Sequence, residues 1–242
     1  MVSPAAPRPG TPLRCSHCTQ RGSGVFCALN ADAVKKLDGA QTENLFKKGQ
    51  ILFYEGNPAV GVYCVSAGEV KLSKTGAGGR PQILGIVGPG TLMGHRSLLT
   101  NQPHTMTAEA LVDSRVCFFE KKFFLDLLNQ EPSVSIEVLK KLSQDLDAVE
   151  DRLLDLVEKP VPVRLARLLL MLKEVHGRPS PKGVVLTLGL TREEMAEMIG
   201  TTQETTIRLL SRFKQKGYLR LDKRTIVLAD IPGLLKVARL SL

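Results

Sequence analysis

A long amphipathic helix that ends at two prolines divides this sequence into two parts of different character. Within residues 133–159, apolar residues recur every three or four positions, and Asp, Glu, Gln and Lys fill many of the others. The apolar positions are Leu139, Leu142, Leu146, Val149, Leu153 and Leu156. This spacing is typical of a two-stranded dimer seam, although a helix packed on the rest of its own chain shows a similar pattern. Pro160 and Pro162 then interrupt the helical pattern and indicate a hinge.

The part before this helix consists of short runs of β-branched and aromatic residues, separated by turn signals such as Gly88-Pro89-Gly90. We expect strands at Gln50–Tyr54, Val60–Val65, Glu69–Ser73, Ile83–Val87 and Val116–Phe119. Short strands at this spacing predict an antiparallel barrel or roll, here over residues 31–132. Residues 1–30, which hold three of the five cysteines, are expected to form a flexible lead and a cysteine segment.

The part after the prolines holds nearly all of the positive charge of the chain. Residues 160–242 contain 15 Lys and Arg against 7 Asp and Glu, whereas residues 1–159 contain 18 against 17. A localised excess of positive charge predicts an anionic partner such as nucleic acid. The composition, with 43% hydrophobic residues and five cysteines, excludes collagen-like, disordered and disulfide-scaffold proteins.

A helix-turn-helix pattern lies within this basic part. Thr191 and Glu194 have the spacing of a capping box, which begins a helix. Gly200 lies at the expected tight turn, where a positive φ is favoured. Thr201 or Thr202 can then cap the second helix.

Two further runs, Tyr218–Leu221 and Thr225–Leu228, predict a small β-hairpin with a basic tip at Lys223 and Arg224. A hairpin in this place would be the wing of a winged helix-turn-helix. We therefore predict that residues 160–242 form a winged helix-turn-helix DNA-binding domain. The whole chain is then an α+β protein with a roll-shaped sensor domain, a long dimerisation helix and a DNA-binding domain.

The second helix of this motif is expected to place its first residues in the major groove of DNA. Arg208 can donate two hydrogen bonds to guanine, and Glu204 can accept one from the amino group of cytosine. Gln203 suits adenine or a phosphate. The DNA-binding residues that we predict are Thr191, Thr202, Gln203, Glu204, Thr205, Ile207, Arg208 and Arg212. The basic residues expected to meet phosphates, or to form an ordinary solvated surface, are Arg212, Lys214, Lys216, Lys223 and Arg224.

The order of these features resembles the bacterial cyclic-AMP receptor / fumarate–nitrate reductase regulator (Crp/Fnr) superfamily, whose sensor domain is a cyclic-nucleotide-binding-like β-roll. The segment Thr191–Phe213 carries much of the resemblance, and its Glu204-Thr205-x-x-Arg208 piece is specific to the family. The resemblance implies a homodimer that binds a palindromic double-stranded DNA operator. It also implies a TGA-like half-site read by Glu204 and Arg208, with half-sites about one helical turn apart.

Two residues of the second helix depart from the family pattern, and one loop corresponds to a family feature. Thr206 stands where the family has a β-branched aliphatic residue, and Ile207 replaces a small residue, which affects the outer bases of the half-site. The loop Gly76–Pro81 corresponds to a region that implies RNA polymerase as a partner.

The nucleotide-binding members of the family carry a Gly-Glu pair for the ribose and an Arg-Ser pair for the phosphate. The corresponding stretches here are Met93–Arg96 and Pro103–Thr107, in which the Glu and the Arg are missing. A cyclic phosphate would be buried without a partner, which costs on the order of several kcal/mol. The sequence therefore argues against a cyclic nucleotide as the signal.

Four of the five cysteines point to a different signal. Cys15 and Cys18 form a C-x2-C pair, Cys27 follows after eight residues, and Cys117 lies on a predicted strand. This arrangement resembles the oxygen-sensing iron–sulfur branch of the family. The resemblance implies that Cys15, Cys18, Cys27 and Cys117 are the metal ligands that bind a [4Fe–4S] cluster as cofactor.

Other interpretations of the cysteines remain open. Cys15, Cys18 and a further Cys with His17 suit zinc, two of the thiols suit a disulfide switch, and inert thiols are a third alternative. Haem would need a ligand from His17, His95, His104 or His176. Cys64 lies in an apolar strand and is assigned to the core.

In the expected mechanism, the cysteine segment near the N-terminus controls DNA binding by the C-terminal domain. An intact cluster would tie the N-terminal segment to the roll through Cys117, about twenty residues before the seam helix, and so favour the dimer. Oxygen or nitric oxide would destroy the cluster, weaken the dimer and lower DNA affinity.

Several other classes of protein are excluded at this stage. The longest uniformly apolar runs, such as Leu168–Leu172, are far shorter than the roughly 18 residues of a membrane span. Met1–Pro12 has no apolar signal-peptide core, so the thiols are expected in a reducing cytoplasm. We expect no enzyme, because the sequence shows no Ser-His-Asp arrangement, phosphate-binding loop or recognisable pair of carboxylates.

Overall fold

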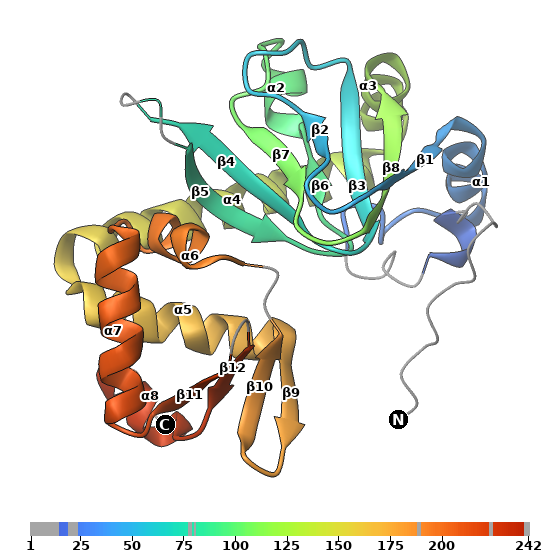
Figure 1. Cartoon of the computed structure of the whole chain (residues 1–242). Helices are drawn as coiled ribbons and strands as arrows, with labels where there is room; N and C mark the ends of the chain where they lie inside the picture. Colours follow the sequence, from blue (N-terminus) through green and yellow to red (C-terminus); the bar gives the residue numbers. More distant parts are fainter. Residues whose placement is uncertain are drawn as a thin grey trace. The chain divides into compact units, whose positions relative to one another are not determined.

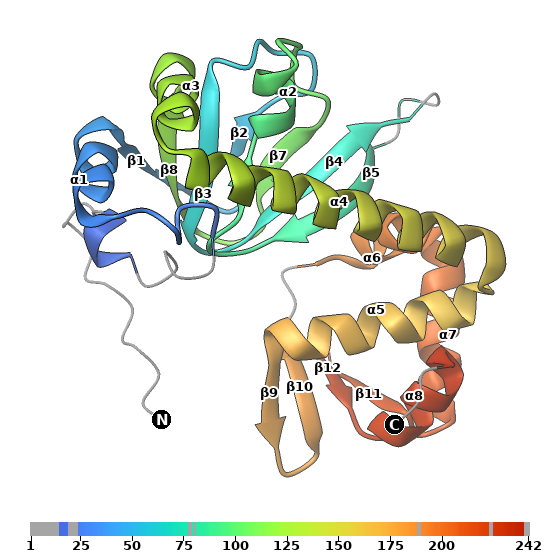
Figure 2. The same ribbon diagram turned by 180° about the vertical axis from the view of Figure 1, so that it is seen from behind.

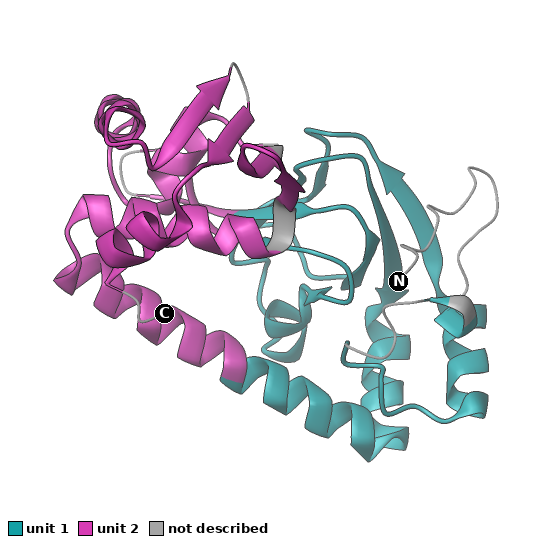
Figure 3. Cartoon of the chain, turned by 90° about the horizontal axis from the view of Figure 1, so that it is seen from below, with its two compact units in different colours: residues 1–72, 86–143 teal, residues 73–85, 144–242 magenta. Residues whose placement is uncertain are grey.

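The structure is a computed structural model that describes residues 15–18, 24–76, 79, 81–187, 190–222 and 225–239. The chain forms two compact units, coloured separately in Figure 3: residues 1–72 with 86–143, and residues 73–85 with 144–242. The mixture of helices and strands confirms the predicted α+β class. The division between the units lies within helix α4 (Pro132–Glu158), and the prolines follow the end of that helix.

Two four-stranded sheets form the predicted roll (Figure 1). One has the order β1-β8-β3-β6 and the other the order β2-β7-β4-β5. The strands are β1 (Thr42–Phe46), β2 (Ile51–Phe53), β3 (Gly61–Ala67), β4 (Val70–Thr75), β5 (Pro81–Val87), β6 (Leu92–Met93), β7 (Thr107–Ala110) and β8 (Ser114–Glu120). The five predicted strands are all present. β1, β6 and β7 were not predicted, because β6 has only two residues and because Glu and Asn in β1 and Ala and Glu in β7 are residues depleted in strands.

Four helical segments accompany the sheets in the first unit. They are η1 (Cys15–His17), α1 (Ala31–Ala40), α2 (His95–Leu99) and α3 (Lys121–Gln130). Two hydrophobic clusters fill this unit, and the one that includes the helices has Phe119 of β8 and Phe124 of α3 among its largest fully buried side chains. Each fully buried side chain of this kind contributes about 1.5–3 kcal/mol. Val25 and Phe26 belong to the same core, so the end of the cysteine segment is anchored there.

Helix α4 carries the predicted seam, and Figure 2 shows it following α3. Val134 and Val138 near its start are buried in the core of the first unit, and Leu142 packs against that core. The other five seam residues are between 40% and 62% exposed: Leu139, Leu146, Val149, Leu153 and Leu156. The start of α4 therefore packs on its own chain, and the rest presents an apolar stripe to solvent.

The second unit contains the predicted winged helix-turn-helix. Its helices are α5 (Val161–His176), α6 (Arg192–Met198), α7 (Gln203–Gln215) and α8 (Ile231–Ala238). Its sheet has the order β11-β12-β10-β9, formed by β9 (Gly177–Ser180), β10 (Gly183–Thr187), β11 (Leu219–Asp222) and β12 (Thr225–Leu228). Helix α5 packs against α8, and α6 packs against α7. Within the described residues, no helix is long and apolar enough to cross a membrane.

Local geometry agrees with the predicted turn chemistry. Thr191 and Glu194 form both hydrogen bonds of a capping box at the start of α6. Gly200 has φ +63°, and Thr202 is the residue that caps α7, through a hydrogen bond from the Thr205 amide. These features depend on neighbours in the chain, which is why the sequence predicts them.

Candidate functional site

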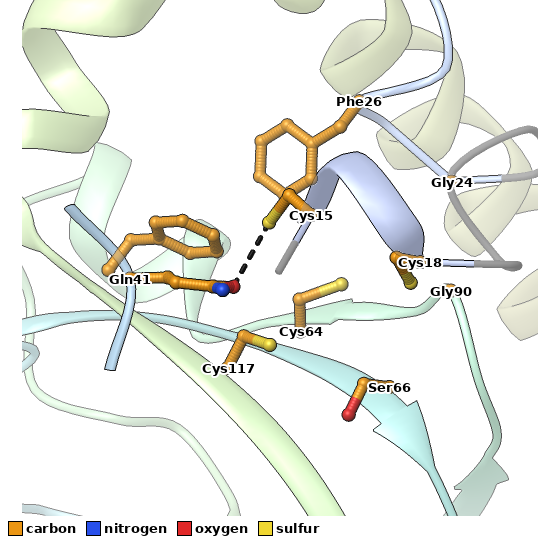
Figure 4. A pocket seen from close by; sticks show the side chains of 10 residues that line it. Cys15, Cys18, Gly24, Phe26, Gln41, Cys64, Ser66, Gly90 and Cys117 are labelled. Carbon is orange, nitrogen blue, oxygen red and sulfur yellow. Dashed lines mark hydrogen bonds between the residues drawn. The ribbon is translucent and has the colours of Figure 1, made fainter. Parts of the chain in front are cut away.

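Four cysteine side chains line one pocket in the first unit, as Figure 4 shows. Cys15 and Cys18 come from η1 and the residue after it, Cys64 from β3 and Cys117 from β8. We call this site the thiol pocket. Its other lining residues are Gly24, Phe26, Gln41, Ser66, Gly90 and Phe119.

The register of the central sheet places two of these thiols together. β3 pairs antiparallel with β8, and Cys64 lies directly opposite Cys117. Directly opposite residues project from the same face of a sheet, so both side chains reach the thiol pocket. Cys64, which the sequence assigns to the core alone, packs against that core and also lines the thiol pocket.

Contacts with α1 and the residue after it hold the C-x2-C pair in place. The Cys15 thiol donates to Oε1 of Gln41 at 3.0 Å, and the Ser16 amide donates to Oδ1 of Asp38 at 3.1 Å. The Cys18 amide donates to the Cys15 carbonyl at 3.2 Å. The pair is therefore tied to α1 and to the residue that caps the end of that helix.

Cys27 lies outside the thiol pocket. Its side chain is exposed, whereas the preceding Phe26 is buried and packs on Phe119 with ring centroids 5.4 Å apart. The pKa of Lys140 in α4 is raised mainly by its hydrogen bond and charge attraction to Glu137, and the nearby Cys27 thiol contributes further. Of the four predicted ligands, three thus line the thiol pocket, and Cys27 is exposed outside it.

Burial controls the protonation of the two strand thiols. It raises the pKa of Cys117 to about 12, with added repulsion from Glu43 and Cys18 and an opposing hydrogen bond with Ser66. Burial also raises the pKa of Cys64, helped by its three thiol neighbours. Both groups are protonated at neutral pH, so a metal must displace a proton from each to bind there. In the described part of the chain, no three His, Cys, Asp or Glu converge closely enough to hold a single metal ion.

The stretches that correspond to the family's nucleotide-binding residues contain two buried histidines. His104 stacks on Phe53 with centroids 4.0 Å apart, and burial lowers its pKa. His95 begins α2 and is also buried. The side chains of His17 and His176 fall outside the described residues.

A second candidate site lies on α7. Gln203, Glu204, Arg208 and Arg212 are exposed, and Ile207 is 47% exposed. Glu204 and Arg208 are four residues apart, so they share one face of the helix. The exposed face of α7 therefore carries the side chains that the sequence predicts to read base edges.

The remaining predicted DNA-binding residues have structural contacts as well. Thr191 and Thr202 use their hydroxyls as helix caps, and the Thr202 hydroxyl also donates to that of Thr205 at 3.0 Å. Thr206 is fully buried, and its hydroxyl donates to the Thr202 carbonyl at 3.2 Å, so a hydroxyl is accommodated there. Lys223 and Arg224 lie outside the described residues, as does part of the loop 76–81.

Comparisons with known proteins identify a family model in each part of the chain. Residues 43–131 match the cyclic nucleotide-binding domain, and residues 163–237 match the Crp-like helix-turn-helix domain. The chain is 28% identical over 217 residues to a CRP-like cAMP-activated global transcriptional regulator of Mycobacterium tuberculosis, covering 90% of this chain and 97% of that protein. It is also 28% identical over 230 residues to the transcriptional activator protein FnrL of Cereibacter sphaeroides, covering 93% and 92%.

The fold is similar to solved structures as well. FixK2 from Bradyrhizobium japonicum superposes with a TM-score of 0.72 and 26% identity, covering 84% of this chain and 99% of that one. The two sequence relatives are transcriptional regulators, which confirms the prediction that the chain is not an enzyme.

Proposed function

Since the chain belongs to the Crp/Fnr family of DNA-binding transcription regulators, we propose that it senses oxygen or nitric oxide through a [4Fe–4S] cluster. In this proposal a homodimer binds a palindromic operator, and the thiol pocket controls how well it does so. The observation that carries the proposal is the gathering of four thiols in one pocket.

The donor set of the thiol pocket fits such a group. Iron–sulfur clusters are held by four cysteine thiolates, and this pocket is lined by four cysteines. When bound, the cluster supplies a centre that oxygen and nitric oxide destroy. Cys15, Cys18 and Cys117 supply three of its ligands, as the sequence predicts; the fourth ligand is either the predicted Cys27 or Cys64.

The thiol pocket and the start of α4 share one hydrophobic core, which supplies the route to the DNA-binding state. Cys117 belongs to that core, and Cys15 and Cys64 pack against it. Val134 and Val138 belong to it as well. Ligation of the thiols therefore alters the packing on which the dimerisation helix begins, because close-packed interiors transmit small displacements.

The exposed stripe of α4 supports the homodimer. Its apolar side chains continue from the packed start of the helix toward its end. Burying them against a second copy removes them from water, and two copies of α7 then face two half-sites. In this proposal Arg208 and Glu204 read the bases, and the basic residues beside them meet phosphates.

The test is purification without oxygen, followed by an absorption spectrum and iron and sulfide analysis. We expect a coloured protein that shifts operator DNA and loses both properties in air. Cys117→Ala should hold far less iron, whereas Phe118→Leu, on the same strand, should load like the wild type. A colourless protein that holds zinc, or Cys117→Ala protein with full iron, would contradict the proposal and favour the zinc or thiol alternatives.

A further inference from the structure

The thiol pocket is lined by Cys64, which the sequence assigns to the core. It is not lined by Cys27, which the sequence predicts to be a ligand. We infer that Cys64, and not Cys27, supplies the fourth thiolate, so that Cys15, Cys18, Cys64 and Cys117 hold the iron–sulfur group. This inference rests on the proposed function and deepens it, because it names the complete set of ligands.

The central sheet fixes the position of Cys64. β3 and β8 are the two inner strands of the sheet β1-β8-β3-β6, and each is hydrogen-bonded on both sides. Cys64 and Cys117 lie opposite each other across these strands, with both side chains at the thiol pocket. A ligand pair on paired inner strands is positioned before any metal arrives.

Phe26 and Cys27 are adjacent, and only one of their side chains faces the thiol pocket. These neighbours lie in one turn, in which the Cys27 amide donates to the Gly24 carbonyl at 3.0 Å. Phe26 lines the thiol pocket and packs on Phe119, whereas Cys27 is exposed. Turning Cys27 inward would withdraw the Phe26 ring from the core that it shares with Val25. Cys64 needs no such rearrangement.

The chemistry of these four thiols also fits an iron–sulfur group. The two strand thiols are buried or partly buried among apolar side chains, and Cys15 and Cys18 close the pocket from the side of η1. Four thiolates of this kind suit soft, sulfide-bridged iron, and each thiol releases its proton to solvent as it binds. In this arrangement Cys27 stays exposed at the surface whether or not the cluster is bound.

Alkylation of the wild-type protein tests the inference without any substitution. Cluster-loaded and cluster-free samples are treated with iodoacetamide in the absence of oxygen, digested and analysed by mass spectrometry. We expect Cys27 to be alkylated at the same rate in both samples, and loading to protect Cys15 and Cys18. Protection of Cys27 upon loading would overturn the inference.

A matched pair of variants gives an independent readout. Cys27→Ala should take up iron and sulfide to the wild-type level, and Cys64→Ala should retain less than half of it. Loss in Cys27→Ala, or full loading of Cys64→Ala, would overturn the inference. Melting curves of both metal-free variants check folding, and if Cys64→Ala does not fold, the alkylation result decides. Failure of the wild type to bind iron and sulfide would instead refute the proposed function.

Discussion

Arg167 of α5 donates two hydrogen bonds to the carboxylate of Asp155 in α4, at 2.8 and 2.9 Å. Its Nε also donates to the Ala238 carbonyl at the end of α8, at 3.1 Å. The two ion-paired residues stand on either side of the prolines that the sequence marks as a hinge. Arg164 adds hydrogen bonds to the carbonyls of Leu156 and Gly200, so arginines of α5 brace the junction between these helices.

Asp155→Ala should lower the free energy of unfolding of the second unit by about 1 kcal/mol, since it removes a partly exposed ion pair in which one guanidinium nitrogen of Arg167 contacts both carboxylate oxygens. The decrease should appear as a lower melting temperature by calorimetry. Glu137→Ala is the control, because it removes the ion pair with the exposed Lys140, which water screens, and should change stability less. Equal effects of the two substitutions would contradict a bracing role for the Asp155–Arg167 pair.

Arg208→Ala should weaken operator binding by about 1–3 kcal/mol and reduce discrimination at one base pair of each half-site. Lys214→Ala should weaken binding to all sequences alike and lower the slope of log affinity against log salt by about 1. Titrations with operator and scrambled DNA at several salt concentrations separate the two behaviours. Lys122→Ala, which removes one exposed charge from α3, serves as the control and should change neither.

Thr202→Ala should lower the free energy of unfolding by about 0.5–2 kcal/mol, because α7 loses its N-cap. It should also weaken DNA binding, since the capped turn precedes the residues that are predicted to contact DNA. Thr202→Ser keeps the hydroxyl and should restore most of both properties. A Ser variant as damaged as the Ala variant would show that the methyl group, and not the cap, is what matters.

Val149→Glu should abolish the dimer without unfolding the chain. Val149 is 59% exposed, so the charge costs little in a single chain but is buried against its equivalent in a seam. Light scattering should give the mass of one chain, and operator affinity should fall at least tenfold. Glu150→Ala lies on the next position of the same turn and should leave the mass of the dimer unchanged. A dimeric Val149→Glu protein would place the interface elsewhere.

Asp113→Asn should make the melting temperature less dependent on pH in the acid range. The pKa of Asp113 is lowered by hydrogen bonds from the Lys47 side chain at 2.8 Å and the Lys48 amide at 3.0 Å. A lowered carboxyl pKa stabilises the fold above the ordinary value and loses that contribution as the pH falls through the lowered pKa. The variant should therefore melt below the wild type at pH 7 and converge with it in acid. Lys47→Met should show the same convergence.

The sequence predicts the elements whose causes are local. The capping box at Thr191, the turn at Gly200 and the end of α4 before Pro160 depend on residues within a few positions of each other. The helix-turn-helix and the five clearer strands follow for the same reason. β1, β6 and β7 were missed because β6 has only two residues and the other two contain Glu, Asn or Ala, which are depleted in strands; these strands depend on their pairing with β8, β3 and β2.

For the candidate metal site too, the sequence predicts some of the residues and the fold decides the others. From the sequence by itself, the arrangement of Cys15, Cys18, Cys27 and Cys117 resembles a known family and predicts one set of ligands, and three of these four cysteines line the thiol pocket. The sequence could not place Cys64, since a slip of one residue between β3 and β8 would turn that thiol to the other face of the sheet. Nor could it show that the predicted ligand Cys27 is exposed, because the burial of Phe26 against Phe119 decides which of two adjacent side chains points inward. Register and core packing are properties of the whole fold, and only the tertiary structure decides them.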